Sequence, residues 1–443
     1  MPIAAFAFKI SENDKKGTKD MNRPFSPART QSAAPGPLAG LKVVDLTHVM
    51  AGPTCTLMLA DMGADVIKIE KWPAGDDTRH SVPPKIGDEA ASFLMMNRNK
   101  RGIVLDLKSA GGKQILRRLV ASADVLVENF APGAMERLGF GYDELHKDFP
   151  ALIYCSLSGF GRTGPYKHRR GFDLVAQAMS GIMSFTGERP VGPPVKCGPP
   201  LSDITAGLLA AMGILAAYTH RLKTGEGQWV ETSLFEAALV QTYWQSTIAL
   251  AANTAPRAMG SAHPLNAPYQ AFEASDGWLV VGGANQKHWL LMLQVLGATE
   301  LASDPRFVNG SDRMAHLKEL EAELSRRFAT QTRDHWLAAL DERGVPCGPV
   351  NDMLQALSDP QTLARDMVVE VEHATLGPVK TIGLPVKFSE TPGQVRAGAP
   401  VYGEHSREVL REYGFDDAQI EAFEREGAVF SAAAVPKSQA QIA

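Results

Sequence analysis

The 443-residue sequence has little cysteine, and its cysteines are not paired. Cys55, Cys155, Cys197 and Cys347 are far apart and form no CxxC motif, a spacing that provides no zinc site and is typical of a protein of the reducing cytoplasm. There is no HxxxH or HExxH pattern among the eleven histidines, no GxxxxGK[ST] and no GxSxG. The usual signatures of metal-dependent, P-loop and serine-hydrolase chemistry are therefore missing.

Long apolar runs and an excess of positive charge are also missing. No uninterrupted apolar stretch approaches the roughly 18 residues that a membrane helix needs. The nearest is a helical pattern over 204–219, whose Gly and Ala content is typical of close packing inside a globule. The net charge of −4 argues against nucleic-acid phosphates as the main ligand. We expect neither a membrane nor a nucleic acid as partner, so any anion site must be a local group of Lys and Arg.

Short apolar runs alternate with helical patterns from residue 41 onwards. This alternation predicts an α/β fold in which helices cover both faces of a parallel sheet. The runs are LKVVDLT, DVIKIEK, GIVLDLK, DVLVENF and LIYCSLS. In such sheets ligands bind outside the carboxyl ends of the strands, so the residues that follow each run are the candidates for a site.

After residue 203 the pattern changes. A long helix, a strand at GQWVETS and a second long helix are expected to carry the chain away from the sheet, and QAFEASDGWLVVGGAN is expected to form a hairpin. The chain exceeds one usual core and is predicted to divide into six parts. These are a flexible extension over 1–37, the first part of a large domain over 38–235, a linker helix and loop over 236–262, a small α+β domain over 263–352, a linker and return to the large domain over 353–434, and a flexible tail over 435–443.

One glycine motif lacks the sequence context that nucleotide binding needs. The segment GFGRTG, residues 159–164, matches GxGxxG and follows a predicted strand. A dinucleotide-binding turn also needs its last glycine to open a helix. Here Pro165, Tyr166 and a basic cluster follow, so a nicotinamide-dependent oxidoreductase is only a weak alternative.

Several cations follow the predicted strands. Lys71 ends the second and Lys108 ends the third, Arg137 lies just past the fourth, and Lys167, Arg169 and Arg170 come after the fifth. Any one of them alone is more often a solvated surface residue. Together at one sheet edge, beside backbone N–H groups of NFAPG, they would form a phosphate site without a P-loop.

Two acids flank this predicted site. Asp173 and Asp203 each stand at the predicted start of a helix, where a carboxylate commonly acts as a cap. The positive end of the helix is also expected to keep each carboxylate ionised at neutral pH. An ionised carboxylate can attack an activated acyl carbon. From these residues alone, capping and catalysis both remain open.

Long segments of the chain resemble the class III CoA-transferase family, which includes formyl-CoA transferase, carnitine CoA-transferase and α-methylacyl-CoA racemase. The resemblance runs from about residue 38 to residue 430. It is carried by GLKVVDLTHVMAGPTCTLMLADMGADVIKIEKWPAGDDTR, NRNKRGIVLDLK, DVLVENFAPGAMERLGFGYDEL, GFDLVAQAMSG and PLSDITAGLLAAMGILAAYTHRLKTGEGQWVETSLFEAAL. It implies a Rossmann-like large domain that binds CoA, a smaller α+β domain, and an interlocked homodimer of two rings.

The resemblance also implies a function and a set of site residues. Asp203 would attack an acyl-CoA thioester to give a mixed anhydride and then an aspartyl-CoA thioester, with no metal and no tightly bound cofactor; CoA enters as the thioester substrate. The substrates would be an acyl-CoA and a free carboxylic acid, and the enzyme would be cytoplasmic. The implied CoA contacts are His48, Val49, Ala51, Lys71, Leu105, Lys108, Asn129, Phe130, Ala134, Arg137 and Arg170. Asp173 would support the site.

Departures from the family pattern bear on specificity. Met50 replaces the glutamine of formyl-CoA transferase, which argues against formate and oxalate, and RAMGSAH replaces its glycine-run loop, so we expect Gly260 to lie in a mobile loop over the intermediates. Phe172 replaces the histidine base of the racemases and cannot titrate, so transfer is favoured over epimerisation. A small dicarboxylate acceptor with a succinyl-CoA-like donor is expected. A racemase-type epimerase and, less favoured, a non-catalytic CoA-binding protein remain the alternatives.

Overall fold

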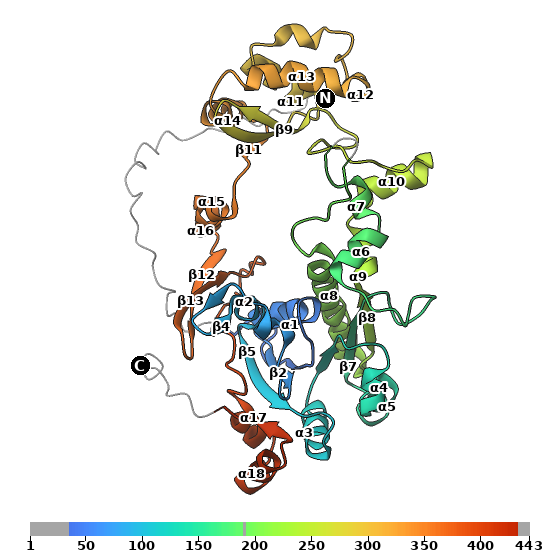
Figure 1. The fold of residues 1–443 in the computed structure, drawn as a ribbon, viewed down its shortest axis with the longest axis vertical. Coiled ribbons are helices and arrows are strands. Elements are labelled where there is room, and N and C mark those ends of the chain that lie inside the picture. Colours follow the sequence, from blue (N-terminus) through green and yellow to red (C-terminus); the bar gives the residue numbers. More distant parts are fainter. Residues whose placement is uncertain (1–34, 189–191, 433–443) are drawn as a thin grey trace, which may run out of the picture. The chain divides into compact units, whose positions relative to one another are not determined.

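The computed structural model describes residues 35–188 and 192–432. Most of the extension predicted over 1–37 and all of the tail predicted over 435–443 lie outside the described residues. Figure 1 shows the fold, and its labels are used below.

The described residues contain a seven-stranded sheet with the order β14-β5-β2-β1-β6-β7-β8. All neighbouring strands run parallel except β14, which is antiparallel to β5. The strands are β1 (Lys42–Asp45), β2 (Asp65–Lys71), β5 (Lys100–Leu105), β6 (Val125–Glu128), β7 (Ile153–Ser158), β8 (Trp229–Ser233) and β14 (Val429–Phe430). The five predicted strands and the parallel sheet are confirmed.

Helices cover both faces of this sheet. Neighbouring residues in a strand point to opposite faces, so Val43 joins the core beneath one set of helices and Val44 the core beneath another. The first set is α1 (Ala51–Asp61), α8 (Leu201–Thr224) and α9 (Leu234–Val240). The second is α3 (Ala110–Val120), α5 (Tyr142–Asp148), α17 (Ser406–Glu412) and α18 (Asp417–Arg425).

The order of the strands reverses at β1. The chain passes from β1 to β2 and β5 on one side, then returns to β6, β7 and β8 on the other. A crevice opens outside the carboxyl ends of the strands at such a switch point and is the usual ligand site of these sheets. The residues after β1 and β6 are therefore placed at this point.

Two expectations about the chain after residue 203 were wrong. β8 does not leave the sheet, because it pairs in parallel with β7 from Tyr154↔Trp229 to Ser158↔Ser233. The second long helix is also broken: α9 ends at Val240, and α10 (Tyr243–Ala252) begins after the Gln241–Thr242 turn.

A second core lies between Ala267 and Val345. The predicted hairpin is confirmed as β9 (Tyr269–Ala274) and β10 (Gly277–Gly282), to which β11 (Cys347–Pro349) adds a third strand. The helices that cover it include α11 (Gln286–Val295), α13 (Leu317–Phe328) and α14 (Arg333–Glu342). The stacked rings of Phe272 and Phe328, 4.8 Å apart, join the hairpin to α13.

The remaining elements are short. They are β3 (Lys85–Ile86), β4 (Glu89–Ala90), α2 (Ala91–Asn97), α4 (Ala134–Leu138), α6 (Asp173–Met179), α7 (Ile182–Phe185), α12 (Gly310–Ala315), α15 (Met353–Ser358), α16 (Pro360–Ala364), the β12–β13 pair (Val368–His373 and Gly377–Ile382) and two 3-10 turns, η1 (Asp77–His80) and η2 (Thr299–Ala302).

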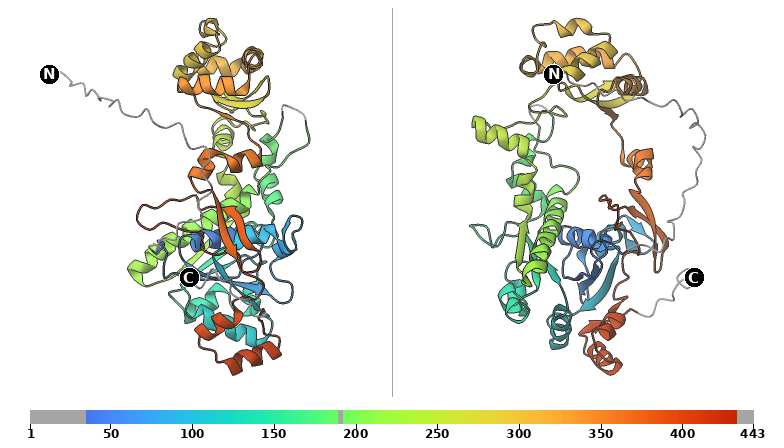
Figure 2. Two further views of the ribbon diagram at one scale, coloured as in Figure 1. Left: turned by 90° about the vertical axis from the view of Figure 1, so that its left-hand side faces the viewer. Right: turned by 180° about the vertical axis from the view of Figure 1, so that it is seen from behind.

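By length and composition, α8 could cross a membrane. The core helices of soluble proteins pass the same test. Here α8 packs against α1, α9, β7 and β8, as Figures 1 and 2 both show.

Candidate active site

The turn that follows β1 has an unusual backbone. Val49 has φ 67°, the left-handed region that a β-branched residue seldom adopts. Its N–H donates to Asp76 Oδ1 at 3.2 Å, and the preceding Thr47 carbonyl accepts from Lys68 Nζ at 2.9 Å. Side chains thus hold this turn in place at the switch point of the sheet.

Asn129, the first residue after β6, grips the same turn. Its Oδ1 accepts the His48 N–H at 2.9 Å, and its Nδ2 donates to the His48 carbonyl at 2.8 Å. The neighbouring Phe130 ring lies 5.4 Å from the imidazole of His48. The structure therefore brings together four predicted site residues from the ends of two adjacent strands: His48, Val49, Asn129 and Phe130.

The imidazole of His48 is held neutral. Burial, and then the positive charge of Lys68, lower the pKa of His48 to about 4. Its Nδ1 is buried and has no hydrogen-bond partner within the described residues. A buried polar atom normally finds a partner, so this atom is available to a ligand.

Asp203 lies in the first turn of α8, but it is not the cap of that helix. The helix begins at Leu201, and its N-cap position is Pro200, which makes no side-chain cap. Asp173, at the start of α6, takes that role: its Oδ1 accepts the Ser202 N–H at 2.9 Å. The capping interpretation of Asp203 was wrong, and its carboxylate makes no hydrogen bond within the described residues.

A glycine brings α8 against the turn. A Cβ on Gly207 would lie only 2.5 Å from the Ala51 carbonyl oxygen and 2.7 Å from Thr54 Cβ. Only glycine permits this approach of α8 to the start of α1. Asp203 stands four residues before Gly207, one helical turn toward the N-terminus on the same face. The close crossing therefore directs Asp203 to the side of α8 that faces α1.

The surroundings of Asp203 do not favour the fully ionised carboxylate that was expected from its place at the start of a helix. Burial, and then the negative charge of Asp173, raise the pKa of Asp203 to about 7. Asp203 is therefore only partly ionised at neutral pH in the protein without ligand.

Asp173 is fixed by its own contacts. Its Oδ2 accepts from Gln177 Nε2 at 2.7 Å, while Gln177 Oε1 accepts the Cys197 N–H at 2.9 Å. Asp173 thus ties α6, the loop before α8 and the first turn of α8 together. The preceding Phe172 is 72% exposed and takes no part in this network.

The predicted phosphate-binding cations lie near the carboxyl edge of the sheet, and each is exposed. Lys71 ends β2 and pairs with Asp77 at 2.5 Å. Lys108 comes three residues after β5, which ends at Leu105 and not at Lys108 as predicted. Arg137 lies in α4, which begins at Ala134, and Arg170 lies in the loop between β7 and α6.

Met50 and Gly260 are the remaining predicted site residues. Met50 is the N-cap of α1. Gly260 is exposed with φ 63°, and its N–H donates to the Gly187 carbonyl at 3.0 Å. The GFGRTG segment opens no helix, because α6 does not begin until Asp173.

The buried charges around the site were not predicted from the sequence. Lys68–Asp76 and Lys100–Asp45 are completely buried ion pairs with N–O distances of 2.8 and 3.1 Å. Arg162, from the rejected glycine motif, pairs with the buried Glu128, whose pKa burial raises to about 7 despite that partner. A lysine within a strand covered on both faces was the available signal, since a charge there must find a partner.

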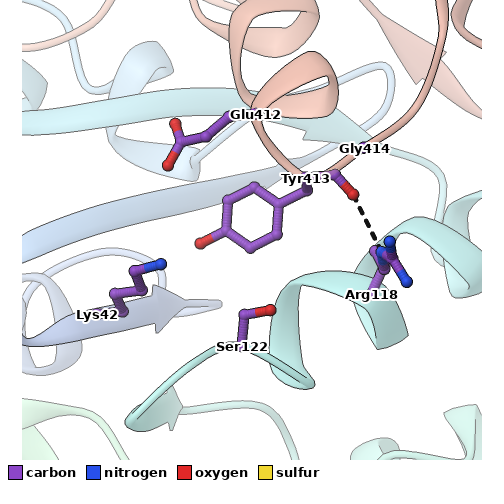
Figure 3. A pocket seen from close by; sticks show the side chains of 6 residues that line it. All are labelled: Lys42, Arg118, Ser122, Glu412, Tyr413 and Gly414. Carbon is purple, nitrogen blue, oxygen red and sulfur yellow. Dashed lines mark hydrogen bonds between the residues drawn. The ribbon is translucent and has the colours of Figure 1, made fainter.

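A separate cavity of about 250 Å³ lies at the amino-terminal ends of the strands of the sheet. Lys42, at the first residue of β1, lines it with Arg118, Ser122, Glu412, Tyr413 and Gly414 (Figure 3). Arg118 Nε donates to the Tyr413 carbonyl. Because the strands are parallel, this cavity is at their amino ends and apart from the site described above.

Comparison with known proteins places this site in a family. The model of CoA-transferase family III matches residues 38–406. The chain belongs to CoA-transferase family III. The family's succinyl-CoA:glutarate CoA-transferase from Mus musculus is 37% identical over 87% of this chain and 88% of its own. The acetyl-CoA:oxalate CoA-transferase from Acetobacter aceti is 42% identical, and the match covers 88% of this chain and 99% of that protein.

Solved family members also share the fold. A CAIB/BAIF family protein from Brucella suis is 40% identical and superposes with a TM-score of 0.77, over 86% of this chain and all of its own. As a family III member, this chain is an acyl-CoA:carboxylate CoA-transferase, which confirms the predicted enzyme class.

Proposed function

We propose that this enzyme moves CoA from a succinyl-CoA-like donor to a small dicarboxylate through covalent intermediates on Asp203. The observation that carries the proposal is the Asp203 carboxylate, free of hydrogen bonds within the described residues and placed on the face of α8 that meets the start of α1, directly after the turn that follows β1. The dicarboxylate is supported by the relatives named above and by a succinyl-CoA:mesaconate CoA-transferase from Haloarcula marismortui, 40% identical over 86% of this chain and 97% of its own.

The proposed reaction has four steps. An Asp203 oxygen attacks the thioester carbonyl, and the C–S bond breaks. CoA thiolate departs, and the donor acyl group remains on Asp203 as a mixed anhydride. The thiolate attacks the aspartyl carbonyl and releases the donor acid, leaving an aspartyl-CoA thioester. The acceptor carboxylate attacks this thioester, and the freed thiolate then attacks the acceptor's acyl carbon. The products are the new acyl-CoA and free Asp203.

We assign the other predicted residues to CoA in this proposal. His48, Val49 and Ala51 border the thioester, and the unpartnered Nδ1 of His48 is an atom that a bound thioester or pantetheine group would satisfy. The nucleotide end would lie along the carboxyl edge of the sheet. Lys71, Leu105 and Lys108 would line it. The other CoA contacts would be Asn129, Phe130, Ala134, Arg137 and Arg170.

Product analysis tests the reaction. The protein is incubated with succinyl-CoA and a panel of carboxylates, and the CoA products are read by mass; a new acyl-CoA is expected. Hydroxylamine added with acyl-CoA should convert Asp203 to its hydroxamate, and modification at another residue would reassign the nucleophile. Epimerised branched acyl-CoA as the sole product would favour the racemase, and CoA binding without any product would favour a binding protein.

The proposal includes an interlocked homodimer. No residue of α10 or α15 is buried. Among their apolar side chains, Tyr243 is 70%, Leu250 87% and Leu354 80% exposed. Apolar surface of this kind is typical of subunit interfaces. Light scattering is expected to give twice the 47.7 kDa chain mass, and a monomer at micromolar concentration would contradict this part.

The proposed division into a large CoA-binding domain and a small domain is supported by their separate cores. A cytoplasmic location is supported by the cysteines. All four lie within the described residues and are free thiols, including Cys55 and Cys155, which are neighbours in the core. In the proposed reaction the enzyme uses no tightly bound cofactor.

A further inference from the structure

A buried ion pair lies directly behind the turn after β1. Lys68 Nζ and Asp76 Oδ2 are 2.8 Å apart, and both side chains are fully buried. The same Lys68 Nζ donates to the Thr47 carbonyl at 2.9 Å, and the other Asp76 oxygen accepts the Val49 N–H at 3.2 Å. The two partners therefore hold the backbone on both sides of His48.

The turn needs support of this kind. In the left-handed region the Cβ of an L residue crowds the following carbonyl, and a branched side chain makes the conformation less favourable still. Such a conformation persists only where its surroundings determine it. The N–H and carbonyl of His48 are held by Asn129, so the Lys68–Asp76 pair supplies the contacts at the two flanking residues, Thr47 and Val49.

Asp76 is itself fixed from several directions. Its Oδ1 also accepts the Thr78 N–H and hydroxyl at 2.9 and 2.8 Å, and its own N–H donates to Glu70 Oε2 at 2.9 Å. Glu70 is in turn paired with Arg79 at 2.7 Å. The chain of contacts from Arg79 to Val49 gives Asp76 one position, which is what a positioning residue requires.

We propose that Asp76 and Lys68 are positioning residues for the acyl-transfer step, because together they hold Val49 in the left-handed conformation that faces the thioester. The inference rests on the proposed function. Both side chains are fully buried, so neither is open to substrate. Their effect on turnover passes through the backbone of Val49, and it therefore depends on how strongly residue 49 resists that conformation.

A double-mutant cycle between Asp76→Asn and Val49→Gly tests this dependence. Asparagine has one acceptor oxygen, so it cannot serve both Lys68 and Val49, and turnover should fall. Glycine enters the left-handed region without the steric penalty. The factor by which Asp76→Asn reduces kcat should therefore be about ten times smaller in the Val49→Gly enzyme than in the enzyme with Val49. A ratio of this size is what relief of left-handed strain allows. An equal loss in both backgrounds would overturn the proposal.

A second buried pair provides the matched control. Asp61 and Arg98 are 2.6 Å apart, both buried, and make no contact with the turn. Asp61→Asn should lower stability, yet its effect on kcat should be the same in the native and Val49→Gly backgrounds. If Asp76→Asn does not fold, the combination Lys68→Met with Asp76→Leu leaves no buried charge unpaired. This combination should show the same rescue by Val49→Gly.

Hydrogen exchange separates failure of this proposal from failure of the proposed function. Amides of the peptide spanning residues 41–57 should exchange faster in Asp76→Asn than in the native protein, and at the native rate in Asp61→Asn. This readout needs no substrate. Faster exchange in Asp76→Asn, with no CoA transfer by the native enzyme, would reject the proposed function but support the clamp, that is, the hold of Lys68 and Asp76 on the turn after β1. Unchanged exchange in Asp76→Asn would reject the clamp.

Discussion

Replacing Asp203 by asparagine should abolish CoA transfer and also stabilise the fold at high pH. Burial and the charge of Asp173 raise the pKa of Asp203 from 3.8 to about 7. Between these values the folded protein binds more protons at this site than the unfolded chain does. Stability therefore falls as the pH rises through this window, and the full penalty is present above pH 7. Asparagine does not titrate, so Asp203→Asn removes this penalty.

The size of the effect follows from the shift. About three pKa units correspond to roughly 4 kcal/mol at about 1.36 kcal/mol per unit. The side chain is partly reached by solvent, which screens the charge and reduces the expected gain to about 1–2 kcal/mol. The gain should be present at pH 8 and small at pH 4, where the native aspartate is protonated in the folded state and partly protonated in the unfolded chain.

Urea unfolding of both proteins at pH 4 and pH 8, followed by tryptophan fluorescence, measures this difference. Asp143 gives a matched control, since it is an exposed acid in the first turn of α5. Asp143→Asn should show no gain at pH 8. The reasoning is refuted if Asp203→Asn is no more stable than the native protein at pH 8, or if it transfers CoA at the native rate. For the native enzyme, kcat/KM should fall below pH 7 as the nucleophile becomes protonated.

Three further substitutions test the site. Asp173→Asn removes the negative charge beside Asp203, so the midpoint of the kcat/KM profile should move below pH 7; an unmoved midpoint would contradict the assigned cause. Gly207→Ala places a methyl group against the Ala51 carbonyl and should cost about 1–3 kcal/mol in urea unfolding while lowering kcat; unchanged values would show that the helices can separate freely. Gly260→Pro cannot adopt the positive φ and loses its N–H donor. It should leave the Kd for CoA unchanged while hydrolysis of acyl-CoA rises or transfer falls, and no change in either would remove Gly260 from the mechanism.

The sequence was sufficient to predict the sheet and to select several residues that the fold brings together at its switch point. Val- and Ile-rich runs separated by helical patterns have few stable solutions other than a covered parallel sheet. The residues after β1 and β6 were then candidates by position alone. Asn129 and His48 do meet at the switch point.

Other features depend on contacts that no local pattern encodes. Nothing in THVMAG indicates that Val49 has a positive φ, because side chains from β2, η1's N-cap and the end of β6 impose it. The start of α8 was predicted too late because aspartate is a common N-cap residue and Asp203 was taken for one. In the structure the capping contact to the first turn of α8 comes from Asp173, on another helix. The pKa of Asp203 likewise depends on burial and on a neighbour 30 residues away in the chain.

The clamp around the turn after β1 acts on main-chain atoms. Lys68, Asp76 and Asn129 bind carbonyl and N–H groups of Thr47, His48 and Val49, and none of these contacts involves the side chain of Met50. Position 50 can therefore change its side chain while the scaffold beside it keeps its shape. A saturation library at this one codon therefore tests whether residue 50 selects the acid, with little risk to the fold around it.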